Sequence, residues 1–223
     1  MQCKAFLTNS PLIKDWLMDT LFATFGSGNC FKAHLIMEQL SIPHELHWID
    51  VLKGEQKAPS FLELNPNGTV PFLLTSEGKG ITESNAMLWY LAKGSALFPE
   101  TGMSEAETIQ WMIFEQTKLE PFISPARFFS VILPQRKEEM ASQIAEWQER
   151  AAIGMERLNA HLSTRSFMIE NRYTIADIAI FGYVHVADEA GLDFGCYPAV
   201  GQWIERVENQ SGYQHILSYK PAA

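Results

Sequence analysis

Cysteine is scarce in this chain of 223 residues, which has Cys3, Cys30 and Cys196. An odd number of scattered cysteines predicts no disulfide framework and favours a reducing, cytoplasmic location. The chain also lacks any apolar run near the roughly 20 residues of a membrane helix. Positive charge is in deficit, because 17 basic and 26 acidic residues give a net charge of −9. This balance disfavours nucleic acid and anionic membranes as partners.

Several sequence signals for sites are missing as well. There is no glycine-rich phosphate loop, and no Cys/His/Asp cluster has the usual metal-ligand spacing, so we predict no metal. Residues 1–17 do not form a convincing signal peptide, because Lys4, Lys14 and Asp15 interrupt their apolar segments. We therefore expect an N-terminal extension over residues 1–17 and a folded domain that begins at Met18.

Residues 18–94 alternate between strand and helix patterns. Strands are predicted over 19–25, 44–51, after Pro71, and at 81–82; helices are predicted over 29–41, 56–64, and from Glu83. The order is βαβαββα. The first strand-helix-strand unit predicts a parallel pair, and the short glycine-containing link between the last two strands predicts a hairpin.

The remainder of the chain is predicted to be helical. Residues 95–103 form a linker, and 104–223 form an all-helical domain, with a long amphipathic helix over 140–162. Thr174 and Asp177 have capping-box spacing at the start of a helix predicted over 175–190, which is apolar on most sides. Another helix begins at Pro198 and continues to 207.

The most informative segment surrounds Pro71. A turn at residues 65–68 precedes this proline, which heads an apolar strand and is a candidate for a cis peptide bond. Such a bond leaves the backbone of Val70 free to pair with an extended peptide. Glu83 and Ser84 then begin a helix, where free N–H groups and a carboxylate can hold an amino-acid head group.

Four motifs together resemble the cytosolic glutathione S-transferase superfamily, in particular its bacterial members. They are Ser27-Gly-Asn-Cys30, Val70-Pro71, Glu83-Ser84-Asn85 and Thr174-Ile-Ala-Asp177, and the resemblance covers about residues 19–215. It implies a thioredoxin-like N-terminal domain, an all-α C-terminal domain and a homodimer. It also implies glutathione as co-substrate and a small hydrophobic electrophile as its partner in the reaction.

The resemblance assigns catalysis to Ser27, with Asn29 as its competitor or helper. Ser27 precedes a helix, so its hydroxyl and the helix N-terminus can stabilise a thiolate, although an ordinary helix cap is the alternative. Cys30 lies where thioredoxin-like proteins carry their second cysteine. Because serine replaces the first one, we expect Cys30 to be a small buried residue.

The glutathione-binding residues implied by the resemblance come from three segments. Val70 would pair with the cysteinyl unit, and Glu83 and Ser84 would hold the γ-glutamyl group. Gln56 and Lys57 would contact the glycine carboxylate, although Lys57 is equally well a solvated surface lysine. The full set of expected contacts is Gln56, Lys57, Thr69, Val70, Pro71, Glu83 and Ser84.

The electrophile site is expected between Ser27 and the first helices of the second domain. Its candidates are Trp111, Phe114 and Arg127, together with Phe122, Phe128 and Phe129. Aromatic residues at helical spacing are commonly core residues, and Arg127 can instead bridge two helices or two subunits. His161 and His185 are expected to be structural.

Two alternatives share this sequence pattern. The same glutathione site would serve an enzyme that reduces disulfides or peroxides. The fold can also serve as a binding or regulatory module without catalysis, although such a module would be expected to lose the Ser27 or Glu83-Ser84 positions, which are present here.

Overall fold

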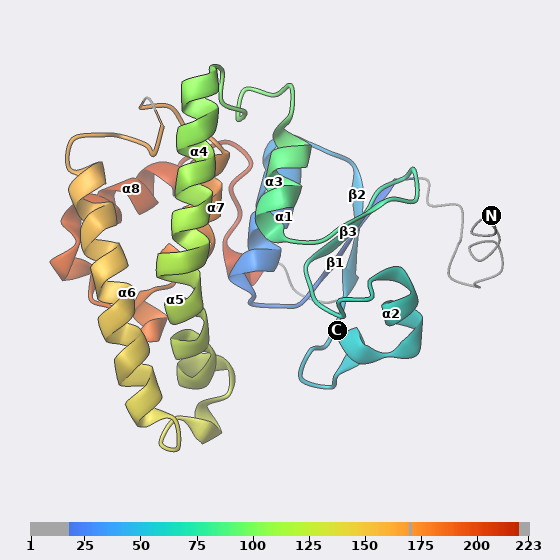
Figure 1. Ribbon diagram of the computed structural model, residues 1–223, viewed down its shortest axis with the longest axis horizontal. Helices are drawn as coiled ribbons and strands as arrows, with labels where there is room; N and C mark the ends of the chain where they lie inside the picture. The colour runs from blue at the N-terminus through green and yellow to red at the C-terminus, as the bar shows by residue number, and fades with distance from the viewer. Residues whose placement is uncertain (1–17, 170, 219–223) are drawn as a thin grey trace.

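The computed structural model describes residues 18–169 and 171–218. A small sheet with its helices lies beside a larger group of helices (Figure 1). This arrangement confirms the predicted fold class, an α/β thioredoxin-like part followed by an all-α part. The extension predicted over residues 1–17 lies outside the described residues.

The sheet has four strands in the order β2-β1-β3-β4. They are β1 (Asp19–Ala23), β2 (His44–Trp48), β3 (Phe72–Leu74) and β4 (Gly80–Ile81). β1 pairs parallel with β2, and β3 pairs antiparallel with β4, which confirms the predicted parallel pair and hairpin. β1 also pairs antiparallel with β3. In this register Phe22 lies opposite Phe72, so the end of β1 and the start of β3 share one edge of the sheet.

Helices cover both faces of this sheet. α1 (Gly28–Gln39) and α3 (Ser84–Ala92) pack on the face that joins the main core. The short α2 (Pro59–Leu64) covers the other face, where Phe61 packs against Phe22 and Phe72. α2 begins with Pro59, whose missing N–H is harmless in a first helical turn.

The second part comprises α4 (Gly102–Phe114), α5 (Glu120–Arg127), α6 (Ala141–Leu162), α7 (Ile175–Val184) and α8 (Pro198–Glu208). Segments of π-helix, Glu115–Leu119 and Phe128–Ile132, lie on either side of α5. Pro121 and Pro125 offer no N–H to a regular helical ladder, which accounts for widened turns in this region. None of the helices in the described ranges is long and apolar enough to cross a membrane.

α7 is buried at every one of its positions. The predicted capping box is confirmed, because Asp177 accepts from the Thr174 amide at 2.9 Å and Thr174 also caps the helix. The prediction that this helix continues to residue 190 is wrong. Regular helix ends at Val184, and a separate short turn follows at Asp188–Ala190. The apolar pattern of 185–190 reflects burial rather than continued helix.

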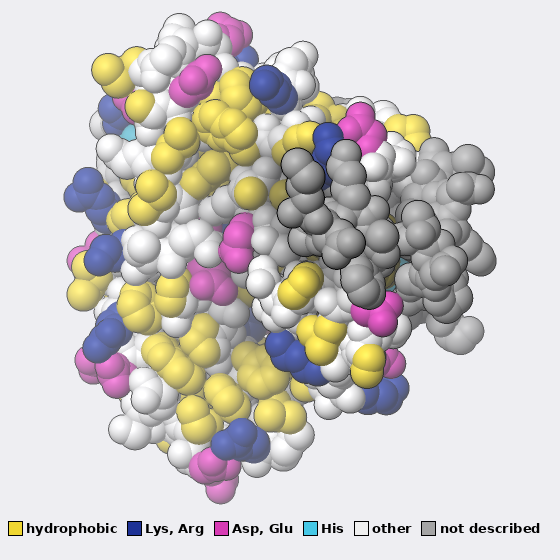
Figure 2. Space-filling view, turned by 45° about the vertical axis from the view of Figure 1, so that its right-hand side comes forward, with side chains coloured by type: hydrophobic (Ala, Val, Ile, Leu, Met, Phe, Trp, Pro, Cys, Tyr) yellow, Lys and Arg dark blue, Asp and Glu magenta, His cyan; other side chains and the backbone are white. Residues whose placement is uncertain are grey.

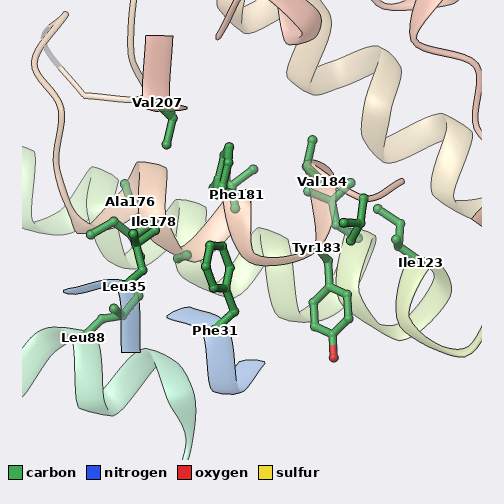
Figure 3. Packing of buried hydrophobic residues seen from close by; sticks show 14 of the residues in the cluster. Phe31, Leu35, Leu88, Ile123, Ala176, Ile178, Phe181, Tyr183, Val184 and Val207 are labelled. Carbon is green, nitrogen blue, oxygen red and sulfur yellow. The ribbon is translucent and has the colours of Figure 1, made fainter. Parts of the chain in front are cut away.

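The main core runs through both parts of the molecule without a break. Phe31 and Leu35 of α1 pack toward Ile178 and Phe181 of α7, as Figure 3 shows. At the first residue of α1, a Cβ on Gly28 would lie 2.2 Å from the carbonyl oxygen of Gly182. The two backbones touch, and the start of α1 is fixed against the helical part.

Candidate functional site

Three segments meet at one edge of the sheet. Ser27 follows β1, the Val70–Pro71 peptide precedes β3, and Glu83 and Ser84 begin α3 after β4. β1 and β3 are neighbours, which brings the first two segments together. A hydrogen bond between Ser84 and Asn29, at 3.0 Å, joins the third to the start of α1. The structure therefore assembles the predicted glutathione-binding and catalytic positions around one place.

Ser27 is the N-cap residue of α1. Its backbone is extended, with φ −79° and ψ 124°, and its hydroxyl oxygen accepts a hydrogen bond from the Cys30 amide at 3.3 Å. The side chain is partly exposed. Unpaired amides and the positive end of the helix dipole therefore face the same small region as this hydroxyl, which is a suitable environment for an anion.

Cys30 is not a reactive thiol in this arrangement. It is 3 % exposed, and its sulfur accepts a hydrogen bond from the Thr24 amide at 3.3 Å. Burial raises the pKa of the Cys30 thiol to about 11, so the side chain is neutral near pH 7. The expectation of a small buried residue is confirmed.

The Val70–Pro71 peptide bond is cis, as predicted. Asn65 shapes the turn before it and is almost fully buried. Its side-chain amide donates to the Thr69 carbonyl at 2.8 Å, and its side-chain oxygen accepts from the Asn67 amide at 3.2 Å. Thr69 is exposed, Val70 is partly buried and Pro71 is buried.

Lys57 and Gln56 lie beside this turn. The Lys57 ammonium is exposed and donates to the Asn67 carbonyl at 3.2 Å, while Gln56 donates to the Val51 carbonyl at 3.5 Å. The structure thus places both residues next to the segment that leads into Val70. This position is compatible with the predicted contact to a carboxylate.

Glu83 has an unusual backbone. Its φ of 67° lies in the left-handed region that favours glycine, and its exposed side chain does not cap α3. A non-glycine residue held in this region costs on the order of 1–3 kcal/mol and commonly marks a functional position. The carboxylate is therefore available to a ligand at the start of α3, directly before Ser84.

Asn29 connects this site to buried charges. Its side-chain oxygen accepts from the Ser84 hydroxyl and from the Lys32 ammonium, both at 3.0 Å. Its amide nitrogen donates to Glu120 at 3.4 Å. Asn29 therefore fixes Ser84 in place in addition to lying two residues from Ser27.

A fully buried ion pair lies beneath Asn29 and was not predicted. Lys32 and Glu115 are both 0 % exposed, and their charged atoms are 2.8 Å apart. Burial, reinforced by Glu115, raises the pKa of the Glu120 carboxyl nearby. The one signal for this pair is the position of Lys32, which stands among residues of α1 that are buried.

Arg127 is 4 % exposed and is used internally. It donates to the Gly26 carbonyl and to Glu189, both at 2.5 Å. Of the two alternatives for Arg127, the structure shows the bridging one, within a single chain. Its role is to hold the loop that precedes Ser27.

Tyr183 of α7 is a second residue that sequence reasoning missed. Burial raises the pKa of its phenol to about 12, and hydrogen bonding with Ser124 and Ser27 works against this shift. The phenol is 6 % exposed and therefore stays protonated beside the Ser27 hydroxyl. The sequence of the α7 segment is apolar on most sides, so it gave no indication of a polar role for the Tyr183 phenol.

Aromatic residues predicted for the electrophile site line grooves that do not reach Ser27. Trp111 packs against Phe114 and His161 and lines a groove of about 650 Å³ between α4 and α6. Phe114 lines a second groove of about 570 Å³ together with Phe122. Neither groove includes Ser27.

The space directly at Ser27 is small. Ser27 lines a cavity of about 20 Å³ together with Cys30, His34, Trp48 and Ile216. Ile132, at the end of the segment that follows α5, lies 3.7 Å from the Cβ position of Gly26. The residues after α5 are therefore the part of the helical domain that borders the loop before Ser27.

Comparison with known proteins gives two family matches. Residues 26–93 match the N-terminal domain of glutathione S-transferase, and residues 116–211 match the C-terminal domain. A solved structure of a possible glutathione S-transferase from Rhodopseudomonas palustris is 39 % identical, with a TM-score of 0.87 over 92 % of both chains.

Two more distant similarities are also informative. The disulfide-bond oxidoreductase YfcG from Escherichia coli is 29 % identical over 87 % of this chain and 91 % of its own. A glutathione transferase from Phanerochaete chrysosporium, solved with oxidized glutathione, is 26 % identical with a TM-score of 0.78, over 87 % of this chain and 90 % of its own. With both domains matched in the expected order, the chain belongs to the glutathione S-transferase superfamily.

Proposed function

We propose that the protein is a glutathione transferase in which Ser27 and the N-terminus of α1 stabilise the glutathione thiolate. The observation that carries this proposal is the position of Ser27. Its partly exposed hydroxyl caps α1, and Asn29 two residues later is hydrogen-bonded to Ser84 at the start of α3. This hydrogen bond would couple the proposed thiolate site to the proposed site for the γ-glutamyl group.

Glutathione would bind across the three segments. The backbone of Val70, set by Thr69 and Pro71, would pair with the cysteinyl unit. The amides at the start of α3 and the exposed Glu83 carboxylate would hold the α-carboxylate and ammonium of the γ-glutamyl end. Gln56 and Lys57 would hold the glycine carboxylate.

The chemistry requires a thiolate. A free thiol has a pKa near 8.5, and each unit by which the pKa falls needs about 1.4 kcal/mol of preference for the anion. A hydrogen bond to a charged group contributes about 1.5–3 kcal/mol, so Ser27 and the helix end can lower the pKa by about two units. The thiol proton leaves to solvent. The sulfur lone pair then forms a bond to the electrophilic carbon, and a leaving group departs with its electron pair.

The first test is a titration of bound glutathione, followed by thiolate absorbance against pH. We expect a thiol pKa below that of free glutathione in the wild type and a return toward the free value in Ser27→Ala. Ser27→Thr, which keeps a hydroxyl, is the matched control. Loss of the shift only in Asn29→Ala would transfer the role to that residue. No binding of glutathione would leave the fold as a non-catalytic module.

A second candidate is glutathione-dependent disulfide reduction. It is favoured by the named activity of the Escherichia coli relative and by the oxidized glutathione in the Phanerochaete structure. Since Cys30 is buried, two molecules of glutathione would supply the electrons, giving oxidized glutathione and two thiols from one disulfide. Parallel assays with an aryl chloride and with 2-hydroxyethyl disulfide separate the two reactions.

A cytoplasmic homodimer is part of the same proposal. Hydrophobic side chains gather on one face of the molecule (Figure 2). On α4, Met103, Ile109 and Ile113 are 71 %, 44 % and 58 % exposed. Ile109 and Ile113 also line a cleft of about 250 Å³ that reaches Glu83. Light scattering of the wild type and Ile113→Asp tests whether this face joins two copies.

A further inference from the structure

Two histidines and a glutamate form a compact cluster between the second half of α1 and the start of β2. The Nδ1 atom of His34 and the Nε2 atom of His44 are 3.2 Å apart. The Oε1 atom of Glu38 lies 4.0 Å from the first and 3.9 Å from the second. Within residues 18–169 and 171–218, this is the group of His, Cys, Asp and Glu side chains whose arrangement could hold a metal ion.

We propose that His34, Glu38 and His44 form a zinc site. Two imidazole nitrogens and one carboxylate oxygen are a common set of protein ligands for this ion, with solvent in the fourth position. Nothing in the glutathione chemistry proposed above uses these residues. The ion would join α1 to β2, two elements connected by a short turn.

The distances suit a tetrahedral ion. Zinc bonds of about 2.0–2.1 Å at tetrahedral angles separate neighbouring ligand atoms by roughly 3.3 Å. The two histidine nitrogens already have nearly this separation. The Glu38 oxygen must approach by somewhat more than half an ångström (~0.6 Å). Its side chain is 32 % exposed, which allows the carboxylate to move.

The surrounding hydrogen bonds orient two of the ligands. His44 Nδ1 lies 2.9 Å from the Ile42 carbonyl, which can only accept, so Nδ1 carries the hydrogen and Nε2 presents its lone pair to the cluster. Such a bond from the distal ring nitrogen to a carbonyl is typical of metal-bound histidine. Gln214 donates to the other Glu38 oxygen at 3.1 Å. Zinc binding requires His34 to carry its hydrogen on Nε2, which is a change of tautomer.

The location also favours a cation. Glu38 lies in the last turn of α1, where the helix dipole is negative. Gln214 brings the C-terminal segment onto the cluster, and Ile216 of the same segment lines a cavity with His34. A metal ion here would therefore link α1, β2 and the end of the described chain. We expect a stabilising role rather than a catalytic one.

The expectation of no metal rested on spacing in the sequence. His34 and Glu38 are four residues apart on one helix face, but His44 follows a helix end and Pro43, so no familiar motif appears. Strand pairing of β2 with β1 is what brings His44 next to α1.

The test is a zinc titration of the full chain without an affinity tag, after removal of metal with a chelator. A chromophoric chelator in competition gives affinity and stoichiometry. We expect one ion per chain, and a loss of affinity of at least about tenfold in His44→Gln and in Glu38→Gln. His47→Gln is the matched control, because this histidine lies on the same strand but is exposed.

Two further readouts guard against misfolded variants. Zinc at about 100 times Kd should raise the wild-type Tm by about 5–10 °C, and the two ligand variants should keep their Tm in the absence of metal but lose this rise. Cobalt(II) should give the visible absorbance of a tetrahedral site in the wild type only. Equal zinc affinity in the wild type and both variants, or no bound ion in the wild type, would overturn the proposal.

Discussion

The hydroxyl of Ser84 donates to the side-chain oxygen of Asn29 at 3.0 Å, and this bond joins the N-termini of α3 and α1. The same oxygen accepts from Lys32, whose ammonium is also paired with Glu115. Through Asn29, these two residues of the candidate site therefore contact a buried charge pair. Changes in that pair are expected to affect both folding and glutathione binding.

Replacing Lys32 with methionine should strongly destabilise the protein. The substitution leaves Glu115 as an unpaired charge at 0 % exposure, and breaking such a pair typically costs about 3–5 kcal/mol. Urea unfolding measures the change. Lys53→Met is the matched control, because Lys53 pairs with Asp50 while 75 % exposed, and water screens such a pair, so the substitution should leave stability nearly unchanged. Equal effects of the two substitutions would refute a structural role for the buried pair.

Replacing Arg127 with methionine should disturb the loop that carries Ser27. The Gly26 carbonyl loses its donor, which typically costs about 1–3 kcal/mol when the acceptor is buried. We also expect the thiol pKa of bound glutathione to rise, because Ser27 follows this carbonyl directly. Arg136→Met, which removes an exposed pair with Glu139, should change neither quantity. An unchanged thiol pKa in Arg127→Met would show that the contact between Arg127 and the Gly26 carbonyl does not affect stabilisation of the thiolate.

Gly28→Ala should be poorly tolerated. The new Cβ would meet the Gly182 carbonyl oxygen at 2.2 Å, and overpacking of this kind typically costs about 1–3 kcal/mol or more. Gly201→Ala in α8 is the opposite case, since nothing lies within 4 Å of its Cβ position. That change should stabilise the helix by about 0.5–1 kcal/mol. Thermal unfolding of both variants checks the predicted difference in sign.

Acid should destabilise the protein through His185. This ring stacks on Phe181 at 4.4 Å, and burial lowers its pKa to about 3 from an unfolded value near 6.5. The unfolded chain therefore binds a proton that the folded chain does not, and stability falls as the pH drops from 6.5 toward 3. The contribution is about 1.4 kcal/mol per pH unit.

His185→Gln removes the side chain that takes up a proton on unfolding. The free energy of unfolding should therefore depend less steeply on pH in this variant. The exposed His47→Gln serves as the control. Denaturant unfolding at several pH values between 4 and 7 gives the slopes. A slope that His185→Gln leaves unchanged would show that other groups cause the acid sensitivity.

Much of the fold was accessible to sequence reasoning because it depends on local signals. The alternation around Leu46, the capping pair at Thr174 and Asp177, and the turn before Pro71 each reflect short-range chemistry. Helix ends were less accessible. The end of α7 at Val184 is set by tertiary packing, and the following residues remain apolar because they are buried.

The arrangement of the candidate site was predictable for the residues at helix starts and in loops. Ser27, Val70 and Glu83 fall together because the strand order brings their segments to one edge. Sequence reasoning missed Lys32, Tyr183 and the internal role of Arg127. Each depends on contacts between segments that lie far apart along the chain, which no local pattern records.

The close contact between Gly28 and Gly182 limits how this protein can be recombined with its relatives. An N-terminal half taken from another member of the superfamily would bring its own α1, whose first turn must fit the α7 backbone of this chain. Ser27 lies immediately before that contact. A chimera joined at the linker would combine α1 of the relative with α7 of this chain and is therefore expected to fold poorly. A chimera that takes both α1 and α7 from the same relative is expected to fold.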